Sequence, residues 1–198
     1  ELVATPYREN RGKDGAREFF EEGMFSTFKQ VYEYACEDVP VTIYYAFKQS
    51  ETETSNDVES TASTGWETML SAIIRAGFSI TGTWPMRTEM ASRMIASGTN
   101  ALASSIVLVC RKRPEGAPMG TRRDFVVALK RELHAALDEL RSSNIAPVDL
   151  AQSAIGPGIG VYSRFSQVLE ADGSPMTVRA ALQIINQELD AYFSDQDG

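Results

Sequence analysis

The feature that most constrains the fold is a pair of apolar segments joined by a polar link, between Ser79 and Arg113. A strand is expected over 78–83, leading into Trp84-Pro85, and a returning strand over 101–111. Short apolar runs rich in β-branched residues are typical of buried strands. The link combines charged, amide and hydroxyl groups with one large aromatic ring, a mixture of little use in a packed core. Functional residues concentrate in loops held by rigid strands, so we expect a functional surface here.

The residues before this pair predict two helices and one further strand. Apolar residues at three- and four-residue steps indicate a helix from Arg17, and Val41–Phe47 reads as a strand covered on both faces. Thr64 and Glu67 form a capping box for a second helix, which Gly77 ends. The expected order is helix, strand, helix, strand, strand, and the predicted class is α/β. Loops or turns are expected over 1–16, 48–63 and 84–100.

A Pro- and Gly-containing linker at 113–118 marks a change of character. We therefore expect two domains, an α/β part over 1–115 and a mostly helical extension over 116–198. Tyr44, Tyr45 and Phe47, at the end of the first strand, are expected to lie mainly in the core.

The extension is expected to begin with a long amphipathic helix capped by Thr121 and Asp124. Its apolar stripe is expected to pack on the last helix, which Thr177 caps; the alternative is that the stripe packs on a partner protein. The Gly-Pro-Gly-Ile-Gly segment at 156–160 is predicted to end a short helix with a tight turn, and another helical turn is expected over 162–169. The stripe consists of Phe125, Leu129, Leu133 and Leu137.

Composition and charge narrow the classes of function. The chain is 43% hydrophobic and 23% charged, which is typical of a soluble globular protein. No apolar run approaches the roughly 20 residues of a membrane helix, and Glu1–Pro6 does not resemble a signal peptide, so no membrane partner is expected. The formal net charge of −8 disfavours nucleic-acid binding by this chain alone, because phosphate attraction supplies most non-specific affinity.

Cysteine and histidine usage excludes several kinds of site. The two cysteines, Cys36 and Cys110, suggest reduced thiols in a cytoplasmic protein, and Cys110 is expected in the core. The single histidine, His134, lies in a helical pattern, so the chain offers no Ser-His or Cys-His pair for catalysis. No Cys/His spacing fits a zinc site.

Several segments together resemble the C-terminal part of one family of proteins. The family comprises large adenine-specific DNA methyltransferase-like proteins of bacteria and archaea, often encoded near anti-phage genes and in part of a zinc-ribbon type. The resemblance covers the chain from about residue 1 to 190. Its segments are TIYYAFKQSE, STGWETMLSAIIRAGFSITGTWPMRTEM, NALASSIVLVCRKRP, NIAPVDLAQSAIGPG and VLEADG.

The resemblance implies the C-terminal half of a class I (Rossmann-like) methyltransferase sheet, closed by an antiparallel strand pair. It also implies transfer of a methyl group from S-adenosylmethionine to adenine N6 in DNA by a full-length parent, as in restriction-modification or anti-phage defence. The Gly-rich cofactor motif and the Asp/Asn-Pro-Pro-Tyr catalytic motif of the family lie upstream of the matched region. Thr5-Pro6-Tyr7 is the nearest trace and lacks both the acid or amide and the second proline. The chain is therefore expected to be a fragment with no catalytic or cofactor-binding residues of its own and to be inactive alone.

Methylation of a base requires that the base leave the stack, and a flipped base needs a stacking face and hydrogen bonds to its edge. Trp84 is the candidate for the face, Arg87 and Glu89 for the polar edge, and Asn100 for an amide contact; Lys48 follows a strand where such folds open onto the active site. In the alternative interpretation, Trp84 closes the strand against the core, and Arg87 and Glu89 pair with each other.

A second hypothesis is a non-catalytic protein-interaction module of a defence-associated complex, which would bind partner proteins rather than act through DNA. The charge of −8 and the missing motifs favour it. Under either hypothesis, half a sheet leaves an unpaired strand edge, so the isolated chain is expected to self-associate.

Overall fold

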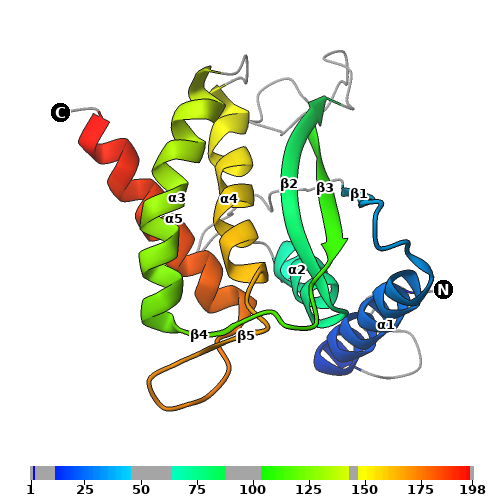
Figure 1. Cartoon of the computed structure of the whole chain (residues 1–198). Helices are drawn as coiled ribbons and strands as arrows, with labels where there is room; N and C mark the ends of the chain where they lie inside the picture. Colours follow the sequence, from blue (N-terminus) through cyan, green and yellow to red (C-terminus); the bar gives the residue numbers. More distant parts are fainter. Residues whose placement is uncertain (1, 3–11, 46–63, 88–103, 143–146, 197–198) are drawn as a thin grey trace.

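The computed structural model describes residue 2 and residues 12–45, 64–87, 104–142 and 147–196. These ranges form a mixed α/β fold with a three-stranded antiparallel sheet and several helices (Figure 1), and the predicted α/β class is confirmed. In chain order the elements are α1 (Gly12–Tyr34), β1 (Val41–Tyr45), α2 (Thr64–Arg75), β2 (Phe78–Arg87), β3 (Ser104–Lys112), β4 (Met119–Thr121), α3 (Arg122–Ser142), α4 (Pro147–Ser163), β5 (Gln167–Leu169) and α5 (Val178–Gln196).

The larger sheet has the strand order β1-β3-β2, and β3 is antiparallel to both of its neighbours. Consequently β1 and β2 run in the same direction, and the connection between them includes α2. The polar link was predicted to begin at Trp84, but β2 continues to Arg87, whose backbone lies opposite Ser104. The strand is longer than predicted because β3 pairs with it past Thr83, and Pro85 is tolerated there because β2 is an edge strand.

One face of the sheet is covered by α2, behind which α1 packs. Trp66 and Leu70 of α2 are buried with Ile106 and Leu108 of β3 in the main core. Gly77 has a φ of 106°, which confirms the predicted left-handed residue after this helix. The predicted capping box is not tested, because the side chain of Thr64 lies outside the described residues.

The first helix is longer than the sequence predicts. Residues 12–16 were expected to belong to a loop, but α1 already begins at Gly12. Gly12 and Gly15 are poor helix formers, which is why local propensity suggested a loop. Ala16 is nevertheless buried, so tertiary packing outweighs the weak propensity of this turn.

The apolar stripe of α3 is buried inside the chain. Its four residues share one core cluster with Leu182 and Ile185 of α5, which confirms the predicted intrachain packing. The interaction-module hypothesis therefore loses the helical surface offered for a partner. His134 lies on the exposed side of α3, with its ring 5.2 Å from the ring of Tyr192.

The prediction of a tight turn at 156–160 is wrong: α4 runs through the segment without a break. A Cβ atom added at Gly156 would lie 1.7 Å from Oγ1 of Thr83, and one added at Gly160 would lie 3.2 Å from the carbonyl oxygen of Ile80. These glycines therefore let the helix lie directly against β2 (Figure 1), where any side chain would hold the two apart. The sequence pattern suggested that the glycines end the helix, whereas they allow α4 to lie close to β2.

Polar contacts fix α4 to the outer edge of β2. The Ile80 N–H donates to the Ser163 hydroxyl at 2.9 Å, and the Ser79 hydroxyl donates to the Ser163 carbonyl at 3.1 Å. The Ile80 N–H at this edge is therefore hydrogen-bonded although no further strand lies beside β2. All three residues are buried, so these bonds are shielded from water.

Arg113 joins the sheet layer to the helical part. Its half-buried guanidinium donates to the carbonyl oxygens of Ile74, Ser163 and Phe165 at 3.1–3.2 Å. Its own backbone N–H donates to the Gly77 carbonyl at 2.9 Å. One side chain therefore ties the end of α2 to the end of α4. Burial lowers the pKa of this guanidinium from its ordinary value, although arginine stays charged in proteins.

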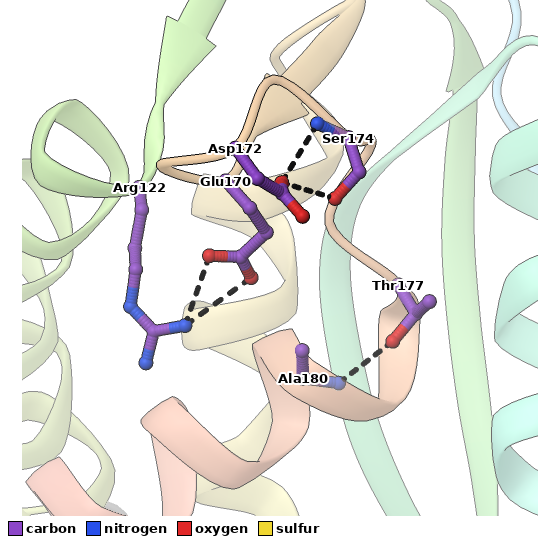
Figure 2. A network of polar contacts seen from close by, with 6 residues as sticks. All are labelled: Arg122, Glu170, Asp172, Ser174, Thr177 and Ala180. Atoms are coloured by element: carbon purple, nitrogen blue, oxygen red, sulfur yellow. Dashed lines mark hydrogen bonds and ion pairs between the residues drawn. The ribbon is translucent and has the colours of Figure 1, made fainter.

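A small parallel ribbon, β4 with β5, connects the helices (Figures 1 and 2). A helical turn was predicted over 162–169, but α4 ends at Ser163 and β5 follows. After β5 the chain makes a tight turn in which Asp172 accepts from the N–H and the hydroxyl of Ser174 (Figure 2). Glu170 pairs with Arg122 at 3.1 Å, so this turn is tied to the first residue of α3.

The predicted capping box of α3 is confirmed, and it makes a pH-dependent contribution to the stability of the fold. The Thr121 backbone N–H and hydroxyl donate to the Asp124 carboxylate at 2.8 and 2.7 Å, while the Asp124 N–H donates to the Thr121 hydroxyl at 3.2 Å. The backbone N–H and then the hydroxyl of Thr121 hold the pKa of Asp124 below its ordinary value. A carboxyl whose pKa is lowered on folding stabilises the fold above its unfolded-state pKa. That contribution is lost as pH falls through the folded-state pKa.

We therefore expect Asp124→Asn to be less stable than the wild type at about pH 6 and to approach it below about pH 3, where the carboxyl is protonated. Urea unfolding of both proteins at the two pH values measures this. A stability difference that is the same at both would show that the charge of Asp124 contributes nothing to the cap.

Candidate functional site: an aromatic row on the open face of the sheet

Only two of the five predicted site residues lie within the part of the chain that the structure describes. Trp84 lies in β2, and Arg87 is the last residue of that strand, although the Arg87 side chain is outside what the structure describes. Lys48, Glu89 and Asn100 lie outside the described residues. The carboxyl ends of β1 and β2 and the amino end of β3 meet at one edge of the sheet, because Tyr45, Ile106 and Pro85 share one register position.

Three side chains form a row across the face of the sheet that α2 does not cover. Tyr44 of β1 and Trp84 of β2 both lie directly opposite Val107 of β3, so all three project from the same face. Tyr44 is 65% exposed and Trp84 58% exposed, whereas Val107 between them is 7% exposed. We call this set the aromatic row.

The Trp84 ring lies along its own strand. A Cβ atom added at Gly82 would lie 3.2 Å from Cζ3 and Cη2 of the indole, so the outer edge of the six-membered ring lies next to Gly82, two residues earlier on the same face. Glycine at this position leaves room for the ring to lie against the strand. The interpretation that Trp84 closes the strand against the core is therefore wrong, because more than half of its surface is exposed.

The opposite face of the same strands is packed. Tyr45 stacks on Trp66 of α2 with ring centroids 5.5 Å apart, and Trp66 is 3% exposed. Burial raises the pKa of Tyr45 above its ordinary value. Neighbouring tyrosines of β1 therefore have different roles, one in the core and one on the open face.

Tyr44 is a residue that sequence reasoning assigned wrongly. It was expected in the core because Val41–Phe47 looked fully apolar, but the described part of this strand alternates between half-buried and exposed residues. The two-residue period of a strand was the available signal, since Thr42 and Tyr44 carry hydroxyls at alternate positions. The small residues of α4 that support β2 were likewise missed.

The described residues around the row are suited to binding a ligand rather than to breaking a bond. Cys110 is fully buried, as predicted, and burial raises the pKa of its thiol to about 12, so it stays protonated. Among the described residues, no group of three or more His, Cys, Asp or Glu side chains could hold a metal ion. What the row presents is a flat, partly exposed ring beside apolar side chains, which suits stacking with another planar ring.

A small polar pocket elsewhere contains charged side chains that pair with neighbouring helices. It lies between α1 and α2 and includes Glu67 and Arg75. Glu67 pairs with Arg179 at 2.8 Å, and Arg75 pairs with Glu22 at 3.1 Å and lies over the Phe25 ring. Its charges therefore serve packing between helices.

Comparison of the chain with protein-family models, with curated proteins and with solved structures finds no match. Within the described ranges, no helix is long and apolar enough to cross a membrane.

Proposed function

We propose that this chain is the closing segment of an S-adenosylmethionine-dependent DNA adenine-N6 methyltransferase and that Trp84 faces the base that is methylated. The observation that carries the proposal is a tryptophan that is 58% exposed on the face of the sheet opposite α2, at the end where the polar link leaves β2. An enzyme that acts on a base must take it out of the stack and give it a new stacking surface.

The directions of the strands and the helical crossover between two of them support the same proposal at the level of the fold. The closing half of a class I methyltransferase sheet is expected to contain two like-directed strands joined by a helical crossover, with an antiparallel strand returning beside them. In this chain β1 and β2 are like-directed, their connection includes α2, and β3 lies antiparallel between them. Ligands of open α/β sheets bind outside the carboxyl ends of such strands, which is the end where Trp84 lies.

The remaining roles belong to this proposal. Arg87 and Glu89 would contact the edge of the base, Asn100 would supply an amide, and Lys48, which follows β1 in the sequence, would face the active site. The Gly-rich cofactor motif of the family is expected upstream of this region, so we assign no S-adenosylmethionine contact to the described residues. We assign cofactor binding, the catalytic motif and most DNA phosphate contacts to the rest of a cytoplasmic parent protein.

The test is methylation and DNA binding by the longer protein carrying Trp84→Ala. Stacking of one base on an aromatic side chain contributes about 1–3 kcal/mol, so we expect DNA affinity to fall about 5- to 150-fold. Trp84→Phe should retain part of the affinity because phenylalanine keeps a ring. Stability should change by less than about 0.5 kcal/mol because the side chain is exposed.

Met119→Ala is the matched control. Met119 is similarly exposed but lies on β4, away from the aromatic row. We expect it to leave binding and methylation unchanged. Equal activity in wild type, Trp84→Ala and Met119→Ala would remove Trp84 from the proposed site.

A further inference from the structure

The two outer edges of the main sheet have different neighbours. The outer edge of β2 is covered by α4, with Ser163 bonded to the Ile80 N–H and Gly160 against the Ile80 carbonyl. In the described part of the chain, β1 is a terminal strand whose second edge has no strand beside it. Alternate residues of a terminal strand direct their N–H and C=O groups outward, so this edge can accept one more strand.

The residues of β1 carry none of the devices that usually protect such an edge. The strand reads Val-Thr-Ile-Tyr-Tyr, with no charged residue and no proline. Its register with β3 is regular over all five residues, so no bulge turns the edge away. Uncharged edges that are rich in β-branched and aromatic residues are the ones that pair with other chains.

Exposed apolar side chains are concentrated in the segment that leads into β1 and in β1 itself. Of the nine large hydrophobic side chains that are exposed in the described part of the chain, four fall between residues 31 and 44, in the last turns of α1, in the connection that follows and in β1. Clusters of this kind mark protein contacts more often than nucleic-acid contacts. The four are Val31, Tyr34, Val39 and Tyr44.

From these observations we infer that β1 is a dimerisation edge at which the chain pairs with a second copy of itself. An antiparallel edge is complementary to its own copy across a two-fold axis. A register centred on Ile43 pairs all five residues, with Thr42 of one copy opposite Tyr44 of the other on the open face. Threonine and tyrosine are favourable cross-strand neighbours.

The covered edge of β2 limits this assembly to two copies. Each chain has one available edge in the main sheet, so pairing through β1 closes the assembly and does not extend into a fibre. A five-residue strand is only about 17 Å long, so the contact is small for a stable dimer and association depends on concentration. If the sheet continues into a longer protein, as the proposed function implies, its next strand would occupy this same edge, so the dimer is inferred for this chain on its own.

The test is sedimentation velocity of the chain over a wide range of concentration, with two edge variants. Thr42→Lys and Tyr44→Lys replace exposed side chains, so both variants should fold, which far-ultraviolet circular dichroism checks. Combined, they place lysine opposite lysine at two symmetric positions and should weaken dimerisation by about tenfold or more. Val127→Lys is the matched control, because Val127 is equally exposed but lies on α3.

The expected result is a monomer–dimer equilibrium in wild type and Val127→Lys that shifts to monomer in the double variant. Amide hydrogen exchange should also slow across residues 41–44 as wild-type concentration rises. A wild type that stays monomeric throughout overturns the inference. A dimer that forms equally well in the double variant also overturns it. The same holds for a dimer that does not slow amide hydrogen exchange in β1, because the contact would then lie elsewhere.

Discussion

Replacing Gly156 with alanine is expected to lower the free energy of unfolding by about 3 kcal/mol. Alanine inside a helix ordinarily stabilises it by up to about 1 kcal/mol relative to glycine, so the expected sign opposes local propensity. The reason is the 1.7 Å approach between the new Cβ atom and Oγ1 of Thr83, whose β-branched side chain has few other rotamers. Relieving that overlap moves α4 away from β2 and disturbs the bond from Ile80 to Ser163.

Gly116→Ala is the control for this change. Gly116 is exposed, and a Cβ atom added there would meet nothing within 4 Å. Its replacement is expected to be neutral or to stabilise by about 0.5 kcal/mol through the unfolded state. Urea unfolding of the wild type and both variants gives the comparison. If Gly156→Ala proved as stable as Gly116→Ala, the close packing of α4 on β2 would be wrong.

Replacing Arg113 with methionine is expected to cost about 3 kcal/mol of stability. Methionine keeps much of the length and the apolar contact but removes every donor. The carbonyl groups of Ile74, Ser163 and Phe165 would lose a charged partner together, at the place where the sheet layer meets the helices. Arg113→Lys should lose part of this, because one ammonium group cannot reproduce the planar fork of a guanidinium.

Arg111→Met tests whether loss of any nearby arginine would do the same. Arg111 is exposed and donates to one carbonyl, that of Asp38, at 3.2 Å. We expect its replacement to change stability by less than about 1 kcal/mol. Thermal and urea unfolding of the three variants supplies the data. Comparable losses for Arg111→Met and Arg113→Met would contradict the role given to Arg113.

The sequence was sufficient to predict elements with a clear period or a clear terminal signal. The stripe of α3 and the capping box of Thr121 with Asp124 were predicted correctly because both depend on neighbours three or four residues away. Gly77 was predicted correctly for the same reason, since a left-handed residue commonly ends a helix. Local rules hold where local contacts dominate.

Predictions failed where distant segments decide the structure. Gly156 and Gly160 look like turn residues in one dimension, and only the presence of β2 explains them inside a helix. Tyr44 looked like a core residue until the register with β3 placed it on the open face. For the candidate site, the sequence pointed to Trp84 but gave no indication that Tyr44 shares its face.

The support for β2 connects stability to the proposed function. Trp84 can present a fixed ring only if its strand is fixed, and the outer edge of that strand is held by α4. Variants that loosen α4, such as Gly156→Ala, should therefore weaken base stacking even though they lie away from the ring. Trp84→Ala should also weaken stacking, but it should leave the stability of the fold nearly unchanged.

The most direct test of the account uses nuclear magnetic resonance, because the chain has two tryptophans in different environments. Trp84 is on the open face, whereas Trp66 is buried under Tyr45. Each gives one indole N–H signal, which isotope labelling of this segment within the longer protein makes visible during titration with an oligonucleotide that carries an unpaired adenine. The account predicts a saturable shift of the Trp84 signal with little change at Trp66, and a smaller shift with a fully paired duplex. Equal shifts at both tryptophans, or none at Trp84 at millimolar oligonucleotide, would contradict it.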